Sequence, residues 1–143
     1  MIRINNIDYQ PNEHESEKAS NSYLMSLIGV IAGFPLPVIN LIATLFFFIS
    51  NKKGTYFVRW HCTQALLSQF SLFIINGIGS WWLILIMFGP VTLSNEFISY
   101  FLVILFMNLT DLVATIYSAI ETRKGIHVHW WFYGDLTTII CRQ

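Results

Sequence analysis

Three long apolar stretches, joined by short polar segments, make up most of the chain. Residues 23–50 and 62–95 contain no charged side chain, and residues 97–120 contain only Asp111. Each stretch reaches the roughly 20 residues that an α-helix needs to cross about 30 Å of hydrocarbon. Helices are expected because lipid offers no hydrogen-bond partner to the backbone. The pattern predicts an all-α integral membrane helical bundle with three to four membrane segments, at about residues 23–50, 62–88 and 97–120.

The first stretch is interrupted in its middle, where "GFPLPVIN" contains Pro35 and Pro37. Each proline removes a backbone donor and disturbs the turn before it. The stretch is too long for one straight span and too short for two full ones. One alternative is a single kinked helix with the N-terminus outside. The other, which two close prolines favour slightly, is a broken pair in which residues 23–34 enter the membrane and residues 36–50 return.

The two ends of the chain are more polar than its middle. Residues 1–22 are slightly acidic and lack the basic lead of a cleavable signal, so we expect a flexible or surface-lying tail before a single membrane domain, residues 23–143. Residues 127–141 are too short to span a membrane after their polar start. Their four consecutive aromatic residues, from Trp130 to Tyr133, are typical of an interfacial anchor. We predict a C-terminal interfacial helix there.

Composition agrees with a membrane protein, since 55% of residues are hydrophobic and 11% are charged, against about 25% charged in soluble domains. A formal net charge of zero argues against nucleic acid as a partner. After residue 50, the basic residues occur only before the second stretch and after the third. The positive-inside rule therefore places loop 51–61 and the C-terminus in the cytoplasm of a bacterial inner membrane, and the Gly89–Glu96 loop outside.

Polar residues recur at helical spacing on the second and third stretches. Each set is spaced three, four, three, which puts its members on one helix face. In an antiparallel pair, His61 would lie level with Ser118, Gln64 with Thr115, Ser68 with Asp111, and Ser71 with Asn108. Asn40 and Thr44 would add a third wall. We predict an intramembrane polar stripe with a cytoplasmic mouth, the stripe comprising Asn40, Gln64, Ser68, Ser71, Asn108, Asp111 and Thr115, and the mouth Arg59, His61 and Ser118.

The neutral members of the stripe are explained by hydrogen bonds between membrane helices. Asp111 is different, because an ionised carboxylate near the bilayer centre costs at least about 2.5 kcal/mol. It is either a protonated structural residue that donates to Asn40 or Ser68, or part of a path for a substrate, an ion or a proton. The sequence leaves both alternatives open.

No pattern in the sequence predicts catalysis. His127 and His129, with His61, Cys62 and Cys141, are residue types that suit zinc, but no tight ligand spacing supports a site, so we predict neither a metal nor a cofactor. The chain has no phosphate-binding glycine loop, catalytic triad or paired carboxylates. A protein without such a constellation is not expected to be an enzyme.

Three segments resemble the Tic-twenty family, which comprises the twenty-kilodalton subunit of the chloroplast inner-envelope import translocon and small bacterial relatives. They are "NKKGTYFVRWHCTQALL", the upstream "YLMSLIGVIAGFPLPVINLIATLFFFISNKK" and the downstream "AIETRKGIHVHWWFYGDL". The resemblance covers residues 22–136, with Gln64-Ala65 its best-defined part. It implies a non-enzymatic subunit or scaffold of a larger membrane assembly, with the lipid bilayer and other membrane subunits or further copies of the chain as partners. The alternative is a conducting path for polypeptide, ion or small solute, with Asp111 in the path.

Overall fold

The structure is a computed structural model, which describes residues 2–5, 10–28 and 37–141. The described residues form five helices and two short strands, so the all-α class is confirmed with a small sheet added. In chain order the elements are β1 (Ile2–Asn5), α1 (Glu13–Met25), α3 (Pro37–Asn51), α4 (Tyr56–Phe88), α5 (Asn95–Arg123), β2 (His127–Trp130) and α6 (Tyr133–Ile140).

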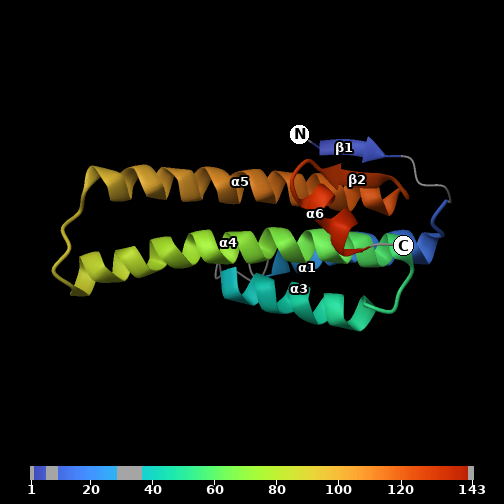
Figure 1. Ribbon diagram of the computed structural model, residues 1–143, viewed down its shortest axis with the longest axis horizontal. Helices are drawn as coiled ribbons and strands as arrows, with labels where there is room; N and C mark the ends of the chain where they lie inside the picture. The colour runs from blue at the N-terminus through green and yellow to red at the C-terminus, as the bar shows by residue number, and fades with distance from the viewer. Residues whose placement is uncertain (1, 6–9, 29–36, 142–143) are drawn as a thin grey trace.

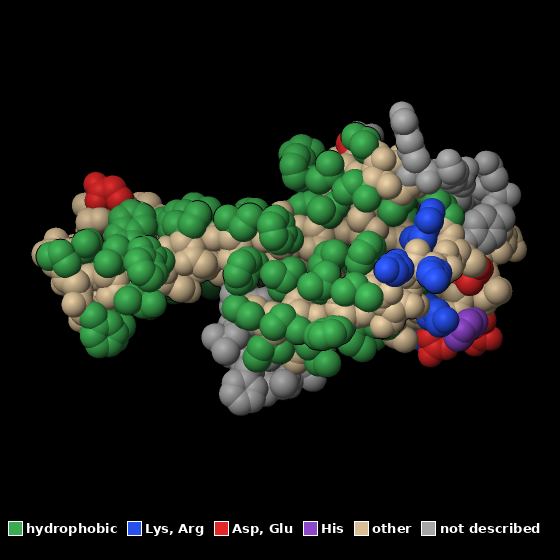
Figure 2. Space-filling model, turned by 60° about the horizontal axis from the view of Figure 1, so that its bottom comes forward, with side chains coloured by type: hydrophobic (Ala, Val, Ile, Leu, Met, Phe, Trp, Pro, Cys, Tyr) green, Lys and Arg blue, Asp and Glu red, His purple; other side chains and the backbone are tan. Residues whose placement is uncertain are grey.

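Helices α4 and α5 form a long antiparallel pair that runs the length of the molecule (Figure 1). In the described part of the chain these two helices are long and apolar enough to cross a membrane. Their apolar side chains face outward: Phe88 is 82% exposed and Phe106 is 68% exposed. Since a soluble protein buries such surface, the exposed belt fits contact with lipid. Hydrophobic side chains likewise cover much of the face in Figure 2, and Lys and Arg gather at one end.

The first predicted membrane segment does not form one span. The chain is already helical from Glu13, and α1 ends at Met25, while the apolar helix α3 has 15 residues, fewer than a full crossing needs. Figure 1 shows α1 and α3 running in opposite directions beside the first half of α4. This arrangement excludes the single kinked helix. The turn of the predicted broken pair falls within residues 29–36, which lie outside the described residues, so the count of three to four membrane segments stays a prediction. Pro35 lies outside the described residues.

The predicted polar tail is wrong for residues 13–22, which belong to α1. Asn12 caps this helix in a capping box with Glu15, with backbone-to-side-chain bonds of 2.8 and 2.9 Å. The buried face consists of small residues and one aromatic: Ser16, Ala19, Ser20 and Tyr23. Small side chains let α1 pack closely against both α4 and α5. The face is too polar for a search by hydrophobicity to detect.

The predicted C-terminal helix over residues 127–141 begins instead as a strand. β2 pairs antiparallel with β1, with Ile2 opposite Trp130 and Asn5 opposite His127. A turn of three residues, 124–126, separates this strand from α5, and Gly125 within it has a φ of 79°. The helical part is limited to α6, which packs on α4. We call this end of the molecule, where β1, α1, β2 and α6 gather around the start of α4 and the end of α5, the head.

Candidate functional site: a buried polar network in the head

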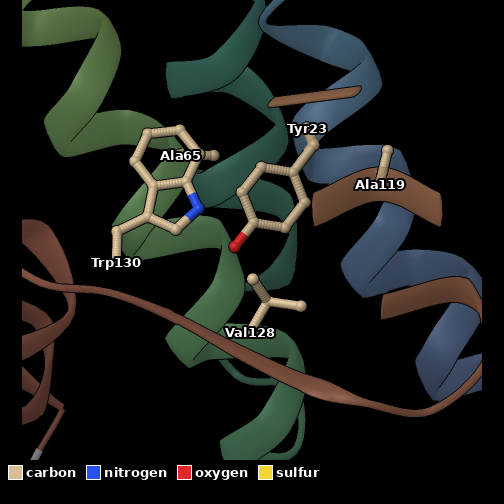
Figure 3. Packing of buried hydrophobic residues seen from close by; sticks show 5 residues of the cluster. All are labelled: Tyr23, Ala65, Ala119, Val128 and Trp130. Atoms are coloured by element: carbon tan, nitrogen blue, oxygen red, sulfur yellow. The ribbon is translucent and has the colours of Figure 1, made fainter. Parts of the chain in front are cut away.

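The core of the head joins four elements around the ring of Tyr23. Tyr23 of α1 and Trp130 of β2 stack with ring centroids 6.2 Å apart, and Ala65 of α4 and Ala119 of α5 close the cluster. Figure 3 shows the Tyr23 hydroxyl pointing between Trp130 and Val128. Ala65 and Ala119 have small side chains, and each is at most 6% exposed. The cluster therefore positions one hydroxyl group inside a closed core.

Gln64 is fully buried and is the centre of a hydrogen-bond network. Its Nε2 donates to Tyr23 Oη at 2.7 Å and to the Val128 carbonyl at 3.2 Å, and its Oε1 accepts from the Trp130 backbone N–H at 3.1 Å. A carbonyl only accepts and a backbone N–H only donates. The two backbone groups of β2 thus determine which end of the amide is nitrogen.

The orientation of Gln64 sets the direction of the next hydrogen bonds. Because Tyr23 Oη accepts from Gln64, its own hydrogen is donated to His61 Nδ1 at 2.8 Å. His61 then carries its proton on Nε2 and donates it to His127 Nδ1 at 3.1 Å. The network runs in one direction, from Gln64 through Tyr23 and His61 to His127. Both imidazoles are assigned as neutral by this hydrogen-bond logic.

Burial keeps the network uncharged. It raises the pKa of Tyr23 above its usual value, against the opposing effect of the Gln64 hydrogen bond. Burial also lowers the pKa of His127 to about 4, with a further contribution from the charge of His129. The lone pair that neutral His61 would offer a metal, on Nδ1, accepts from Tyr23 Oη, and its Nε2 carries the proton donated to His127. Within the described residues there is no group of three or more metal-binding side chains. The arrangement fits a structural role, in which the network attaches α1 and β2 to the long helix α4.

The buried His127 predicts a loss of stability in acid. Its pKa is about 4 when folded and about 6.5 when unfolded, so the unfolded state binds the extra proton first. His127 therefore leaves the free energy of unfolding at its full value above pH 6.5. As the pH falls from 6.5 to 4, it lowers this free energy by up to about 3 kcal/mol. Urea unfolding in detergent at several pH values will measure it. The variant His127→Asn, whose Oδ1 still accepts from His61, should reduce the pH dependence of the free energy of unfolding, and the part due to the buried, neutral His61 should remain.

The matched control is His14→Asn, since His14 is an exposed side chain on α1. It should leave the pH profile of the free energy of unfolding as in the wild type. The same pH dependence in the wild type and in His127→Asn would contradict the buried, neutral state of His127.

Deeper along α4 and α5, a second set of polar side chains joins the two helices. Gln69 Nε2 donates to Asp111 Oδ2 at 3.0 Å, and the amides of Asn76 and Asn108 bond each other at 2.9 and 3.2 Å. Ser68 and Thr115 lie close to the Asp111 carboxyl group. Ser68 and Asp111 therefore lie at the same height along the two helices, as predicted.

Several other pairings differ from the predicted stripe, because α1 and β2 contact both long helices in the head. Gln64 pairs with Tyr23 and β2 instead of Thr115, and His61 pairs with Tyr23 and His127 instead of Ser118. Ser118 accepts instead from Trp130 Nε1 at 2.7 Å. Ser71 bonds its own helix at Leu67 and leaves Asn108 to Asn76.

The predicted cytoplasmic mouth is closed. His61 and Ser118 are fully buried, and the carbonyl of Arg59 accepts from Thr63 Oγ1 at 2.8 Å. Asn40, at the start of α3, lines a cavity together with Asp111. The sequence analysis missed Gln69 and Asn76, which bond Asp111 and Asn108. A pattern in the sequence could have indicated them, because four residues of α4 have the same spacing of three, four and three: Gln69, Leu72, Asn76 and Gly79. This face contacts α5, and a Cβ at Gly79 would meet Ile104.

The model of the magnetosome magnetite crystal formation protein family matches residues 18–136, which run from α1 through both long helices to α6. Comparison with curated proteins and with solved structures gave no match. The resemblance to the Tic-twenty family is thereby corrected: it rested on short motifs between apolar segments, whereas the family model matches residues 18–136. The translocon-subunit interpretation is wrong, and the conducting-path alternative finds no support. The chain belongs to the magnetosome magnetite crystal formation protein family.

Proposed function

We propose that the protein is a non-enzymatic membrane protein of the magnetosome that contributes to magnetite crystal formation. The observation that carries this proposal is the family match over residues 18–136, which includes β2, parts of α1 and α6, and both long apolar helices. The exposed apolar belt of α4 and α5 supports lipid as the surroundings of these helices. Other membrane proteins of the same compartment are the expected partners.

The charge distribution supports one orientation in the membrane. Lys52 and Lys53 precede α4, Arg123 ends α5 and Lys124 follows it, so these basic residues share the head end of the antiparallel pair. Figure 2 shows Lys and Arg gathered at one end of the molecule. The positive-inside rule puts the head in the cytoplasm. The Gly89–Glu96 loop then faces the compartment that holds the crystal. In this proposal the membrane of that compartment derives from the inner membrane.

We place the main role in the head and not in direct contact between the loop and the mineral. From Gly89 to Glu96 the sequence has one carboxylate, Glu96. Carboxylates are the side chains that bind hard cations best, and a mineral surface presents many such cations. One carboxylate is a poor basis for a mineral-binding surface. The head, in contrast, is a closed and hydrogen-bonded structure that can present a constant surface to a partner.

Deletion of the gene in the bacterium that encodes this chain tests the proposal. Electron microscopy should show crystals of altered size or number, and restoring the wild-type chain should return the normal size distribution. Glu96→Gln should restore it as well, because the role lies in the head. Normal crystals after deletion would refute the family-based function. Loss of rescue by Glu96→Gln, at normal membrane levels, would refute the role assigned to the head.

A further inference from the structure

A cavity of about 430 Å³ lies beside the α4–α5 pair, below the head. This volume is within the usual range of ligand sites, about 300 to 1,000 Å³. Its walls are mostly apolar and come from the end of α1 and from both long helices: Leu27, Leu72, Phe101, Leu105, Leu109 and Leu112. Its polar lining includes Asn40, Gln69, Asn76, Asn108 and Asp111.

The cavity is bordered by side chains that face the lipid region. Phe101, Leu105 and Leu109 of α5 are each more than half exposed, and they lie on the apolar stretch of a helix able to cross a membrane. A molecule dissolved among acyl chains would therefore reach the cavity sideways. The expected ligand has an apolar body.

The polar groups of the cavity differ in how far their bonding capacity is used. Asn76 and Asn108 satisfy each other. The Asp111 carboxyl receives a hydrogen bond from Gln69 at 3.0 Å, and the hydroxyls of Ser68 and Thr115 lie beside it. A carboxylate has about four acceptor positions, so at least one is left for a donor from a ligand. Among the ion pairs of the described residues none includes Asp111. A carboxyl group at this depth is stabilised by a further donor, because an unpaired charge in hydrocarbon is costly.

We infer that this cavity binds a long-chain amphiphile from the bilayer whose polar head donates a hydrogen bond, as a hydroxyl or a protonated amine does. The head group lies at Asp111, and the chain lies along the leucine-rich wall. Asp111 is the specificity-determining residue, since it distinguishes a donor head from one that only accepts. This site goes beyond the proposed role in crystal formation, and the inference does not depend on that role.

Photolabelling in lipid nanodiscs tests the site on the full chain. The probe is a long-chain alcohol with a diazirine in its chain, and adducts are mapped by peptide mass spectrometry. Adducts, resolved to single residues, should concentrate on side chains that line the cavity, such as Leu72, Leu105 and Leu112, and unlabelled alcohol of the same length should remove them. The matched methyl ether, which cannot donate, should compete about tenfold more weakly, as expected for one lost hydrogen bond to a buried carboxyl group. Equal competition by alcohol and ether would overturn the inference.

Variants give an independent comparison. Asp111→Leu keeps the branched shape and the number of heavy atoms of the side chain and removes the acceptor, so labelling of the cavity should fall to the level found elsewhere on α5. The control is Thr110→Val, because the exposed Thr110 hydroxyl bonds its own helix at Phe106. It should leave labelling unchanged. Adducts spread evenly over the lipid-facing side of α5, on Phe106 and Val113 as much as in the cavity, would also overturn the inference.

Discussion

Gln64→Leu is expected to lower the free energy of unfolding of the head by about 3 kcal/mol. Leucine is close to glutamine in size, but it leaves the Val128 carbonyl and the Trp130 N–H without their partner inside a closed core. An unsatisfied buried polar group costs about 1 to 3 kcal/mol. Tyr23 Oη also loses a donor. The effect should be large because one side chain connects α1, α4 and β2.

Urea unfolding in mild detergent, followed by tryptophan fluorescence, measures this change, since Trp60 and Trp130 lie in the head. Hydrogen–deuterium exchange should show faster exchange in α1 and β2 but not in the distal half of α4. Ser71→Ala is the control, because the Ser71 hydroxyl bonds within its own helix; its cost should stay below about 0.5 kcal/mol. Wild-type stability in Gln64→Leu would show that the network does not hold the head together.

Gly134→Ala is expected to displace α6 and to cost about 2 kcal/mol. A Cβ at this position would lie 2.7 Å from His129 Cγ and closer still to Nδ1 and Cε1 of the same ring. The ring has little room to move, because Trp60 lies against it with centroids 5.5 Å apart. Overpacking of this kind typically costs 1 to 3 kcal/mol.

Gly77→Ala is the matched comparison, since a Cβ at Gly77 meets nothing within 4 Å. Alanine has the higher helix propensity, so Gly77→Ala should be neutral or stabilising by up to about 1 kcal/mol. Limited proteolysis of the C-terminal segment and urea unfolding will compare the two variants. Equal behaviour of both would contradict the close contact between Gly134 and His129.

The two long helices could be predicted from the sequence because a run of uncharged residues, long enough to cross a membrane, is a strong signal. α4 and α5 extend beyond the predicted limits, to Tyr56 and Arg123, because their ends are covered by the head and tolerate polar residues. α1 was not predicted, since its buried face uses Ser16, Ala19 and Ser20 in place of large apolar residues. Its packing depends on the close approach of α4 and α5, which no local pattern specifies.

The candidate site was predicted in part, and the failure has a clear geometric cause. Gln64 and His61 were selected as polar residues at helical spacing, and both proved to be fully buried. Their partners come from segments far away in the sequence, Tyr23 and residues 127–130. The helix face was also ambiguous, because Gln69 and Asn76 have the same spacing as the predicted stripe. Only the packing of α5 shows which face pairs with Asp111 and Asn108.

The central claim is that both ends of the chain are folded onto the long helices through Gln64. Hydrogen–deuterium exchange of the wild-type protein in lipid nanodiscs tests it most directly. The account predicts slow exchange throughout α1 and at the backbone amides of β2, comparable with the first half of α4 and lost in Gln64→Leu. Exchange of residues 13–25 and 127–130 at the rate of an unstructured peptide would contradict it.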